Sequence, residues 1–104
     1  MRVIAKKHLV AFCQAHPDAK QALLSWYDEA LQAGWLTPQD IKRRYASASF
    51  VGNTRVVFNI RGNAYRLIVD VAYRYQAVYI KFVGTHAEYD KIDVTAVEWK
   101  GSEP

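Results

Sequence analysis

The sequence Arg55-Val-Val-Phe-Asn-Ile-Arg61 is rich in β-branched and aromatic residues, and Tyr65-Arg-Leu-Ile-Val-Asp-Val-Ala-Tyr73 is a second run of the same kind. The pair Gly62-Asn63 lies between them. Two such runs around a Gly-Asn pair predict a β-hairpin in which Gly62 and Asn63 are the loop residues. The predicted register pairs Arg61 with Ala64, Ile60 with Tyr65, Asn59 with Arg66 and Phe58 with Leu67.

The predicted hairpin has one apolar and one polar face, because side chains alternate along a strand. The residues expected to face the core are Val56, Phe58, Ile60, Leu67, Val69 and Val71. Those expected on the other face, which is mainly cationic, are Arg55, Asn59, Arg61, Arg66 and Asp70. Arg66 lies in the middle of its strand, where neighbouring like charges are destabilising unless an anion or Asp70 compensates them.

A third run, Ala77-Val-Tyr-Ile-Lys-Phe-Val83, extends the same pattern. Its expected core residues are Val78, Ile80 and Phe82, and its expected polar-face residues are Tyr79 and Lys81. Gly84 is expected to end this strand.

Beyond Gly84, His86 and Tyr89 are three residues apart and would share one side of a helical turn. Together with Arg66 and Lys81 they place cations, an imidazole and a phenol in one region.

The N-terminal half indicates two helices that cover one face of the sheet. The first is expected from about Lys6 to Ala15, since the residue before Pro17 avoids the helical region. The second is expected from Pro17 to about Ala33, with Gly34 as its stop. The apolar stripes are Leu9, Val10, Phe12 and Cys13 in the first helix, and Ala19, Leu23, Trp26, Tyr27, Ala30 and Leu31 in the second. The segment Arg2-Val-Ile-Ala5 is expected to form a short edge strand.

A short third helix is predicted at Thr37-Pro38-Gln39-Asp40, where Thr37 is the expected N-cap and Pro38 the first helical residue. The helix carries a basic cluster, Lys42-Arg43-Arg44, and residues 46–49 are expected to be a loop before Phe50. Such a cluster is typical of a solvated helix face. The functional alternative is a contact to phosphate or ribosomal RNA.

Length and composition indicate one globular domain spanning residues 1–104, with 51% hydrophobic and 23% charged residues. The net charge of +4 fits either a protein with a polyanionic partner, such as a nucleic acid, or a soluble basic protein without one. Cys13 is the single cysteine, so no internal disulfide can form and a reducing compartment is expected. The sequence has no apolar stretch of membrane-spanning length and no apparent signal peptide. We therefore expect a cytoplasmic protein without a membrane partner.

The chemistry-bearing residues favour RNA cleavage over metal or cofactor chemistry. His8, His16 and His86 lie on different predicted elements without metal-ligand spacing, and no cofactor motif is present. Cleavage by attack of the RNA 2′-hydroxyl needs a base, an acid for the departing 5′-oxygen, and cations for the charge on phosphorus. Residues of these types are supplied by Arg66, Lys81, His86 and Tyr89.

Two stretches carry a resemblance to a known family. They are Val57-Phe-Asn-Ile-Arg-Gly-Asn-Ala-Tyr-Arg-Leu-Ile-Val69 and Tyr79-Ile-Lys-Phe-Val-Gly-Thr-His-Ala-Glu-Tyr-Asp90, which resemble the HigB toxins of bacterial toxin-antitoxin modules. These toxins belong to the RelE/ParE superfamily. The resemblance implies an α+β fold in which N-terminal helices pack on a twisted antiparallel sheet, in agreement with the order of elements expected above.

The resemblance also implies a function and residue roles. A protein of this family is an endoribonuclease that enters the ribosomal A site, contacts ribosomal RNA, cuts mRNA, and is neutralised by a helix-turn-helix antitoxin similar to HigA. By position, Arg66 matches the phosphate-stabilising arginine of the superfamily, and His86 and Tyr89 match its polar pair after the last strand. This chain has Val57 and Asn59 where RelE-like nucleases place lysines, so His86 or Tyr89 would have to assist in place of a lysine base.

The expected site therefore has two parts. Arg66, His86, Tyr89 and Lys81 are the catalytic candidates, and the RNA-binding candidates are Asn59, Arg55, Arg61, Lys42, Arg43 and Arg44. Two rival functions remain: a ParE-like toxin that inhibits DNA gyrase, and an RNA-binding module that does not cut.

Overall fold

The computed structural model describes residues 1–98 of the chain. Its centre is a five-stranded sheet in the order β1-β5-β4-β3-β2. The strands are β1 (Arg2–Ile4), β2 (Ser49–Val51), β3 (Arg55–Ile60), β4 (Tyr65–Ala72) and β5 (Ala77–Thr85). All neighbours are antiparallel except β1, which runs parallel to β5 at the edge. The α+β class and the edge strand are confirmed, whereas the sheet is mixed rather than wholly antiparallel. Strand β2 was not predicted, and its first residue, Ser49, is the last residue of the expected loop 46–49.

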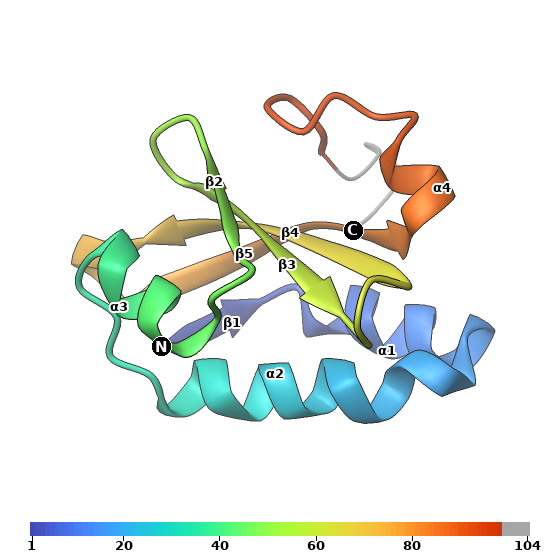
Figure 1. Ribbon diagram of the computed structural model, residues 1–104. Helices are drawn as coiled ribbons and strands as arrows, with labels where there is room; N and C mark the ends of the chain where they lie inside the picture. The colour runs from blue at the N-terminus through green and yellow to red at the C-terminus, as the bar shows by residue number, and fades with distance from the viewer. Residues whose placement is uncertain (99–104) are drawn as a thin grey trace.

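The helices lie mainly on one side of this sheet (Figure 1). They are α1 (Lys6–Ala15), α2 (Lys20–Gln32), α3 (Pro38–Arg44) and α4 (His86–Tyr89), with 3-10 turns η1 (Pro17–Ala19) and η2 (Tyr73–Tyr75). The bounds of α1 are those predicted. The second helix begins later than predicted, because Pro17 opens a 3-10 turn before α2. Among the described residues no helix is both long and apolar enough to cross a membrane.

The predicted start of α3 is confirmed in detail. Thr37 Oγ1 accepts a hydrogen bond from the Asp40 N–H at 3.4 Å, and Asp40 Oδ2 accepts one from the Thr37 N–H at 3.2 Å. The two residues thereby satisfy each other's backbone donors, as in a capping box. Pro38 occupies the first helical position, where its missing N–H costs nothing.

The hairpin register is confirmed, with Ile60 opposite Tyr65, Asn59 opposite Arg66 and Phe58 opposite Leu67. The loop is wider than the predicted pair Gly62-Asn63 and spans residues 61–64. Arg61 and Gly62 both have positive φ, at 53° and 64°, so the chain leaves the strand one residue earlier than predicted. The Ala64 N–H donates to the Arg61 carbonyl at 3.2 Å and closes the loop.

The core lies between the sheet and the pair α1 and α2. Buried residues on this face include Val56, Phe58, Ile60, Leu67, Val69, Val71, Val78 and Ile80, all as predicted. Phe82 is the exception. A register shift between Ile68 and Val69 pairs Ile68 with Phe82 and Val69 with Ile80, which leaves Lys81 as the extra residue of a β-bulge. Phe82 therefore lies on the opposite face, and Val83 enters the core in its place.

The helical stripes are confirmed except at their edges. Leu9, Cys13, Ala19, Leu23, Trp26 and Ala30 are buried. Val10 and Leu31 were also assigned to the stripes but are each 42% exposed. A helix presents only a limited arc to a flat sheet, so residues at the rim of a wide apolar stripe remain in contact with water.

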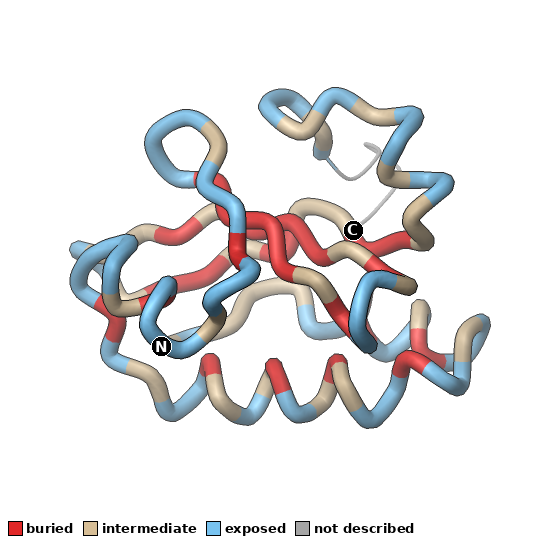
Figure 2. The backbone as a smooth tube through the Cα atoms, viewed as in Figure 1, coloured by how far each residue is buried: buried red, intermediate tan, exposed pale blue. Residues whose placement is uncertain are grey.

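The opposite face of the sheet, here called the outer face, is not wholly polar as predicted. Val57 and Ile68 on this face are both buried. The helix α4 and the segment 90–98 lie over the outer face (Figure 1), and the strands beneath them are buried along much of their length (Figure 2). Two layers therefore cover the sheet, one made by α1 and α2 and a smaller one made by the C-terminal residues.

Replacing Phe58 by alanine tests the core. Its ring is 1% exposed and meets Trp26, Trp35 and Tyr45 at centroid distances of 5.4, 6.4 and 5.1 Å. Removing it should reduce the free energy of unfolding by roughly 3 to 5 kcal/mol and the melting temperature by roughly 10 °C or more. Phe50→Ala is the matched control, because Phe50 is 38% exposed on β2. Equal melting temperatures for the two variants would contradict the assignment of faces.

Candidate functional site

The candidate site lies where β4, β5 and α4 meet. Arg66, the second residue of β4, is paired with Asn59 on β3 and with Gly84 on β5. Its guanidinium carbon lies 4.9 Å from the centre of the Tyr89 ring. Arg66 Nη2 donates a hydrogen bond to Asn63 Oδ1 in the β3–β4 loop, at 2.6 Å. A loop residue, Asn63, and a helix residue, Tyr89, therefore hold the cation of a strand residue.

The single turn α4 brings His86 and Tyr89 to the same place. Their ring centroids are 6.5 Å apart. His86 Nδ1 lies 3.2 Å from Asp90 Oδ2. The backbone N–H of His86 donates to the Ala64 carbonyl at 3.2 Å. The Asp90 carboxylate can orient the imidazole. Of the four residues predicted to gather, the structure brings Arg66, His86 and Tyr89 together. Lys81 is paired with Glu98 instead.

Such a short helix needs support at its start, and the sequence supplies it. Thr85 Oγ1 accepts from the Glu88 N–H at 3.1 Å, while Glu88 Oε1 accepts from the Thr85 N–H at 2.8 Å. This reciprocal pair is a capping box. Sequence reasoning missed the cap, although Thr85 followed three residues later by Glu88 carries its signature.

Gly84 does not end the strand as predicted. It belongs to β5, which continues to Thr85. A Cβ atom at this position would lie 2.5 Å from the Phe82 ring and 2.9 Å from Glu88 Oε1. The absence of a side chain lets Phe82 and the capping carboxylate approach the backbone directly beside Arg66.

Arg55 is a correction to the predicted RNA surface. It is 9% exposed, and its guanidinium donates to the carbonyls of Val94 and Val97 at 3.1 and 2.6 Å. It also pairs with Glu98 at 2.7 Å and with Asp70 at 3.2 Å. Strand alternation places Arg55 on the outer face, but residues 90–98, here called the C-terminal segment, cover that face at this point. Arg55 therefore fastens the segment and has no surface left for RNA.

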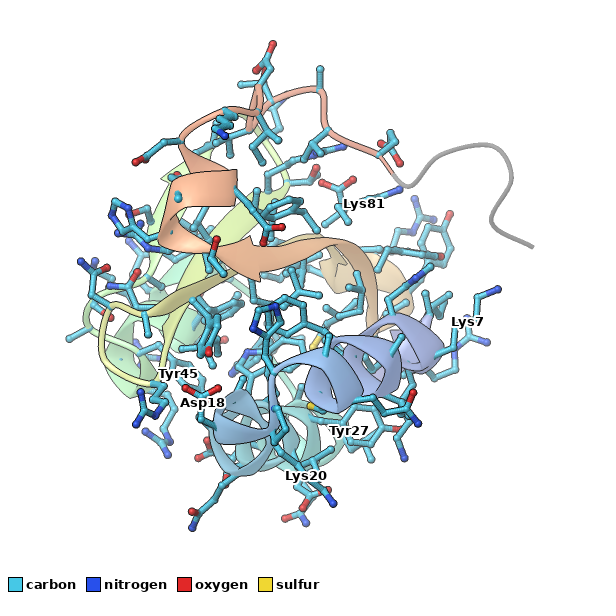
Figure 3. The ribbon with its side chains drawn as sticks, turned by 90° about the vertical axis from the view of Figure 1, so that its right-hand side faces the viewer. Lys7, Asp18, Lys20, Tyr27, Tyr45 and Lys81 are labelled. Atoms are coloured by element: carbon cyan, nitrogen blue, oxygen red, sulfur yellow. The ribbon has the colours of Figure 1, made fainter. Side chains whose placement is uncertain are left out.

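Lys81 is on the outer face, away from α1 and α2 (Figure 3). Its Nζ donates to Glu98 Oε1 at 2.8 Å, and this bond is the main reason that the pKa of Glu98 lies below its ordinary value. The carboxylate of Glu98 thus joins Lys81 and Arg55. Lys81 is paired with an acid, whereas Arg66 has no acidic partner among residues 1–98.

The remaining basic candidates lie elsewhere. Arg61 is exposed in the β3–β4 loop, 3.5 Å from the carboxylate of Asp18. Lys42 donates to the Ala48 carbonyl at 2.7 Å, Arg43 pairs with Asp40, and Arg44 pairs with Glu29. Their helix, α3, is at the end of the sheet opposite α4 (Figure 1). The basic cluster is therefore a separate surface from the Arg66 site.

Metal-ligating groups are not gathered in the described part of the chain: residues 1–98 contain no group of three or more His, Cys, Asp or Glu side chains placed to hold a metal ion. Cys13 is buried, and burial raises the pKa of its thiol. A buried, protonated thiol is a core residue rather than a nucleophile.

Comparisons with known proteins show which family the sequence matches. The profile of the family described as "HigB_toxin, RelE-like toxic component of a toxin-antitoxin system" matches residues 19–92. The chain is 28% identical over 92 residues to the mRNA interferase toxin HigB of Escherichia coli (strain K12), covering 86% of this chain and 88% of that protein. The same identity and coverage hold for the mRNA interferase HigB of Escherichia coli O157:H7 and of Shigella flexneri.

Replacing Gly84 by alanine tests how α4 is seated. The new methyl group would force the Phe82 ring and the Glu88 carboxylate aside and so weaken the cap of α4. We expect large amide chemical-shift changes over residues 85–90 and a lowered melting temperature. Gly34→Ala is the control, since the nearest atom to its Cβ would be 4.0 Å away. Unchanged shifts in Gly84→Ala would contradict the close packing of Phe82 and Glu88.

Proposed function

The chain belongs to the HigB_toxin family of RelE-like toxic components of toxin-antitoxin systems, and we propose on this premise that it is an mRNA interferase that stops translation by cutting messages. Curated relatives that span most of the chain are named mRNA interferases, which supports RNA cleavage rather than inhibition of gyrase. Cleavage takes place on the ribosome in this proposal, with the message in the A site.

The observation that carries the proposal is that Arg66 is a partly buried cation in contact with neutral groups. The basic residues Arg43, Arg44, Arg55, Arg61 and Lys81 each have an acidic partner within 4.0 Å. Within residues 1–98 Arg66 has no such partner, and its neighbours are the neutral amide of Asn63 and the face of Tyr89. A partly buried cation held only by neutral groups favours an anionic ligand. A phosphate group of RNA fits this requirement.

The proposed mechanism follows from the side chains around Arg66. The RNA 2′-hydroxyl attacks the adjacent phosphorus, the bond from phosphorus to the 5′-oxygen breaks, and a 2′,3′-cyclic phosphate and a free 5′-hydroxyl result. His86 and Tyr89 transfer the protons, and Arg66 stabilises the additional negative charge on the phosphate oxygens. The reaction as proposed needs no metal ion. Lys81 contributes only where the RNA displaces Glu98, because these two residues are paired at 2.8 Å.

The proposed RNA surface extends from Arg66 in two directions. Asn59 lies beside Arg66 on β3, and Arg61 is exposed in the adjoining loop. A second basic surface on α3 is formed by Lys42, Arg43 and Arg44. It lies at the end of the sheet opposite the Arg66 site (Figure 1), so it could contact ribosomal RNA while the message occupies that site. Family membership implies an antitoxin, and we propose that it is a helix-turn-helix protein similar to HigA.

Arg66→Ala and His86→Gln should each abolish toxicity in induced cells. Loss of one charged stabiliser of a transition state typically costs on the order of a hundredfold or more in rate. Message cleavage is measured by primer extension on programmed ribosomes, and binding is measured by co-sedimentation. Both variants should still sediment with ribosomes, and the exposed Arg74→Ala should cut normally. Undiminished cutting by Arg66→Ala and His86→Gln would refute the proposed site, while binding by the intact protein without cutting would favour a noncatalytic module.

The basic cluster on α3 should govern the salt dependence of ribosome binding. Replacing Lys42, Arg43 and Arg44 together with glutamine removes three positive charges that would displace counterions from RNA. Affinity should fall and the slope of its logarithm against the logarithm of salt concentration should flatten. The control removes three scattered exposed charges, Lys20, Arg74 and Lys91. The same slope in the cluster variant and the control would assign Lys42, Arg43 and Arg44 to a solvated face.

A further inference from the structure

The β3–β4 loop, residues 61–64, contacts both halves of the proposed site. Asn63 Oδ1 accepts a hydrogen bond from Arg66 Nη2 at 2.6 Å. The carbonyl of the next residue, Ala64, accepts from the His86 N–H at 3.2 Å. Two neighbouring loop residues thus connect the cation on β4 to the backbone of His86 at the start of α4. The conformation of this loop therefore sets the position of Arg66 relative to His86.

The guanidinium of Arg66 has two contacts. Nη2 is bonded to Asn63, and Cζ lies over the Tyr89 ring, 4.9 Å from its centroid. Nε is buried without a hydrogen-bond partner in the described residues. A guanidinium has five N–H donors, of which Asn63 accepts one. Nη1 and the second N–H of Nη2 have no bond to any of residues 1–98. These are the donors at the end of the side chain, where an oxyanion can accept from both.

We infer that Asn63 is a positioning residue, which orients Arg66 so that this end of the guanidinium faces the scissile phosphate. The inference rests on the proposed function. An arginine side chain has several rotatable bonds, and fixing it before the reaction removes an entropic cost from the transition state. Asn63 holds the Arg66 side chain in place through a neutral amide. A carboxylate at the same position would also hold Arg66 but would compete with phosphate for its charge.

The simpler interpretation of Asn63 is that it only forms the turn, because asparagine is favoured in turns for backbone reasons. That interpretation predicts changes in stability and none that depend on Arg66. The positioning role predicts the opposite: a selective loss of cleavage rate, present only while Arg66 is present. A double-mutant cycle separates the two interpretations.

The experiment measures single-turnover cleavage of a message on programmed ribosomes over a range of protein concentrations. The proteins are wild type, Asn63→Ala, Arg66→Ala and the double variant. The control is Asn53→Ala, which alters the corresponding exposed asparagine in the turn between β2 and β3. Melting temperatures are recorded for all five. Asn63→Gly is measured in parallel, since turns accept glycine readily and it also removes the acceptor.

Asn63→Ala should lower the maximal rate by roughly ten to a hundredfold, the range expected for a hydrogen bond to a charged group. The protein concentration at half-maximal rate and the melting temperature should stay nearly unchanged. In the Arg66→Ala background the same substitution should have no further effect, and Asn53→Ala should cut like wild type. Normal cutting by Asn63→Ala and Asn63→Gly, with Arg66→Ala impaired, would overturn this inference alone. Normal cutting by Arg66→Ala would overturn the proposed role of Arg66 and the inference with it.

Discussion

The pairing of β3 with β4 is the constraint on which both the core and the proposed site depend. In the observed register Phe58 lies opposite Leu67 and Asn59 opposite Arg66. A slip of one residue would exchange the faces of every side chain in the moving strand. Phe58 would then leave its contacts with Trp26 and Tyr45, or Arg66 would enter an apolar core. Because both errors are costly, the same hydrophobic pattern that stabilises the fold also fixes where the cation emerges.

Helices, helix caps and strand registers were predictable from the sequence where they depend on side chains only a few residues apart. The bounds of α1, the cap of α3 and the hairpin register all follow from side-chain spacing within a few residues. The β-bulge at Lys81 did not follow, because one extra residue changes the alternation without a local signal in composition. Its consequence is that Phe82 leaves the core face, where it was expected, and Val83 enters the core instead. The 61–64 loop was missed for a similar reason, since Arg61 adopts a positive φ that arginine rarely prefers.

The candidate site was predictable in part. Strand alternation and helical spacing placed Arg66, His86 and Tyr89 in one region, and the structure brings them together. The roles of Arg55 and Glu98 were not predictable, because their contacts join residues about 40 positions apart in a segment without a regular period. Arg55 was expected to face RNA and instead holds the C-terminal segment through two carbonyls and a carboxylate. Long-range contacts of irregular segments are set by the whole fold and leave no local pattern.

The distribution of acids on the outer face gives the site its electrostatic character. Asp70 and Glu98 neutralise Arg55 and Lys81, and the low exposure of Arg55 makes this pairing necessary, since an unpaired charge there would be costly. Arg66 is the second residue of β4, and no acid within residues 1–98 is paired with it. The free-energy cost of partly burying the Arg66 charge is reduced by the Tyr89 ring and by the amide of Asn63, because both stabilise a cation without cancelling its charge. In the described part of the chain, the fold therefore pairs Arg55 and Lys81 with acids and leaves Arg66 oriented, partly desolvated and still able to bind an anion.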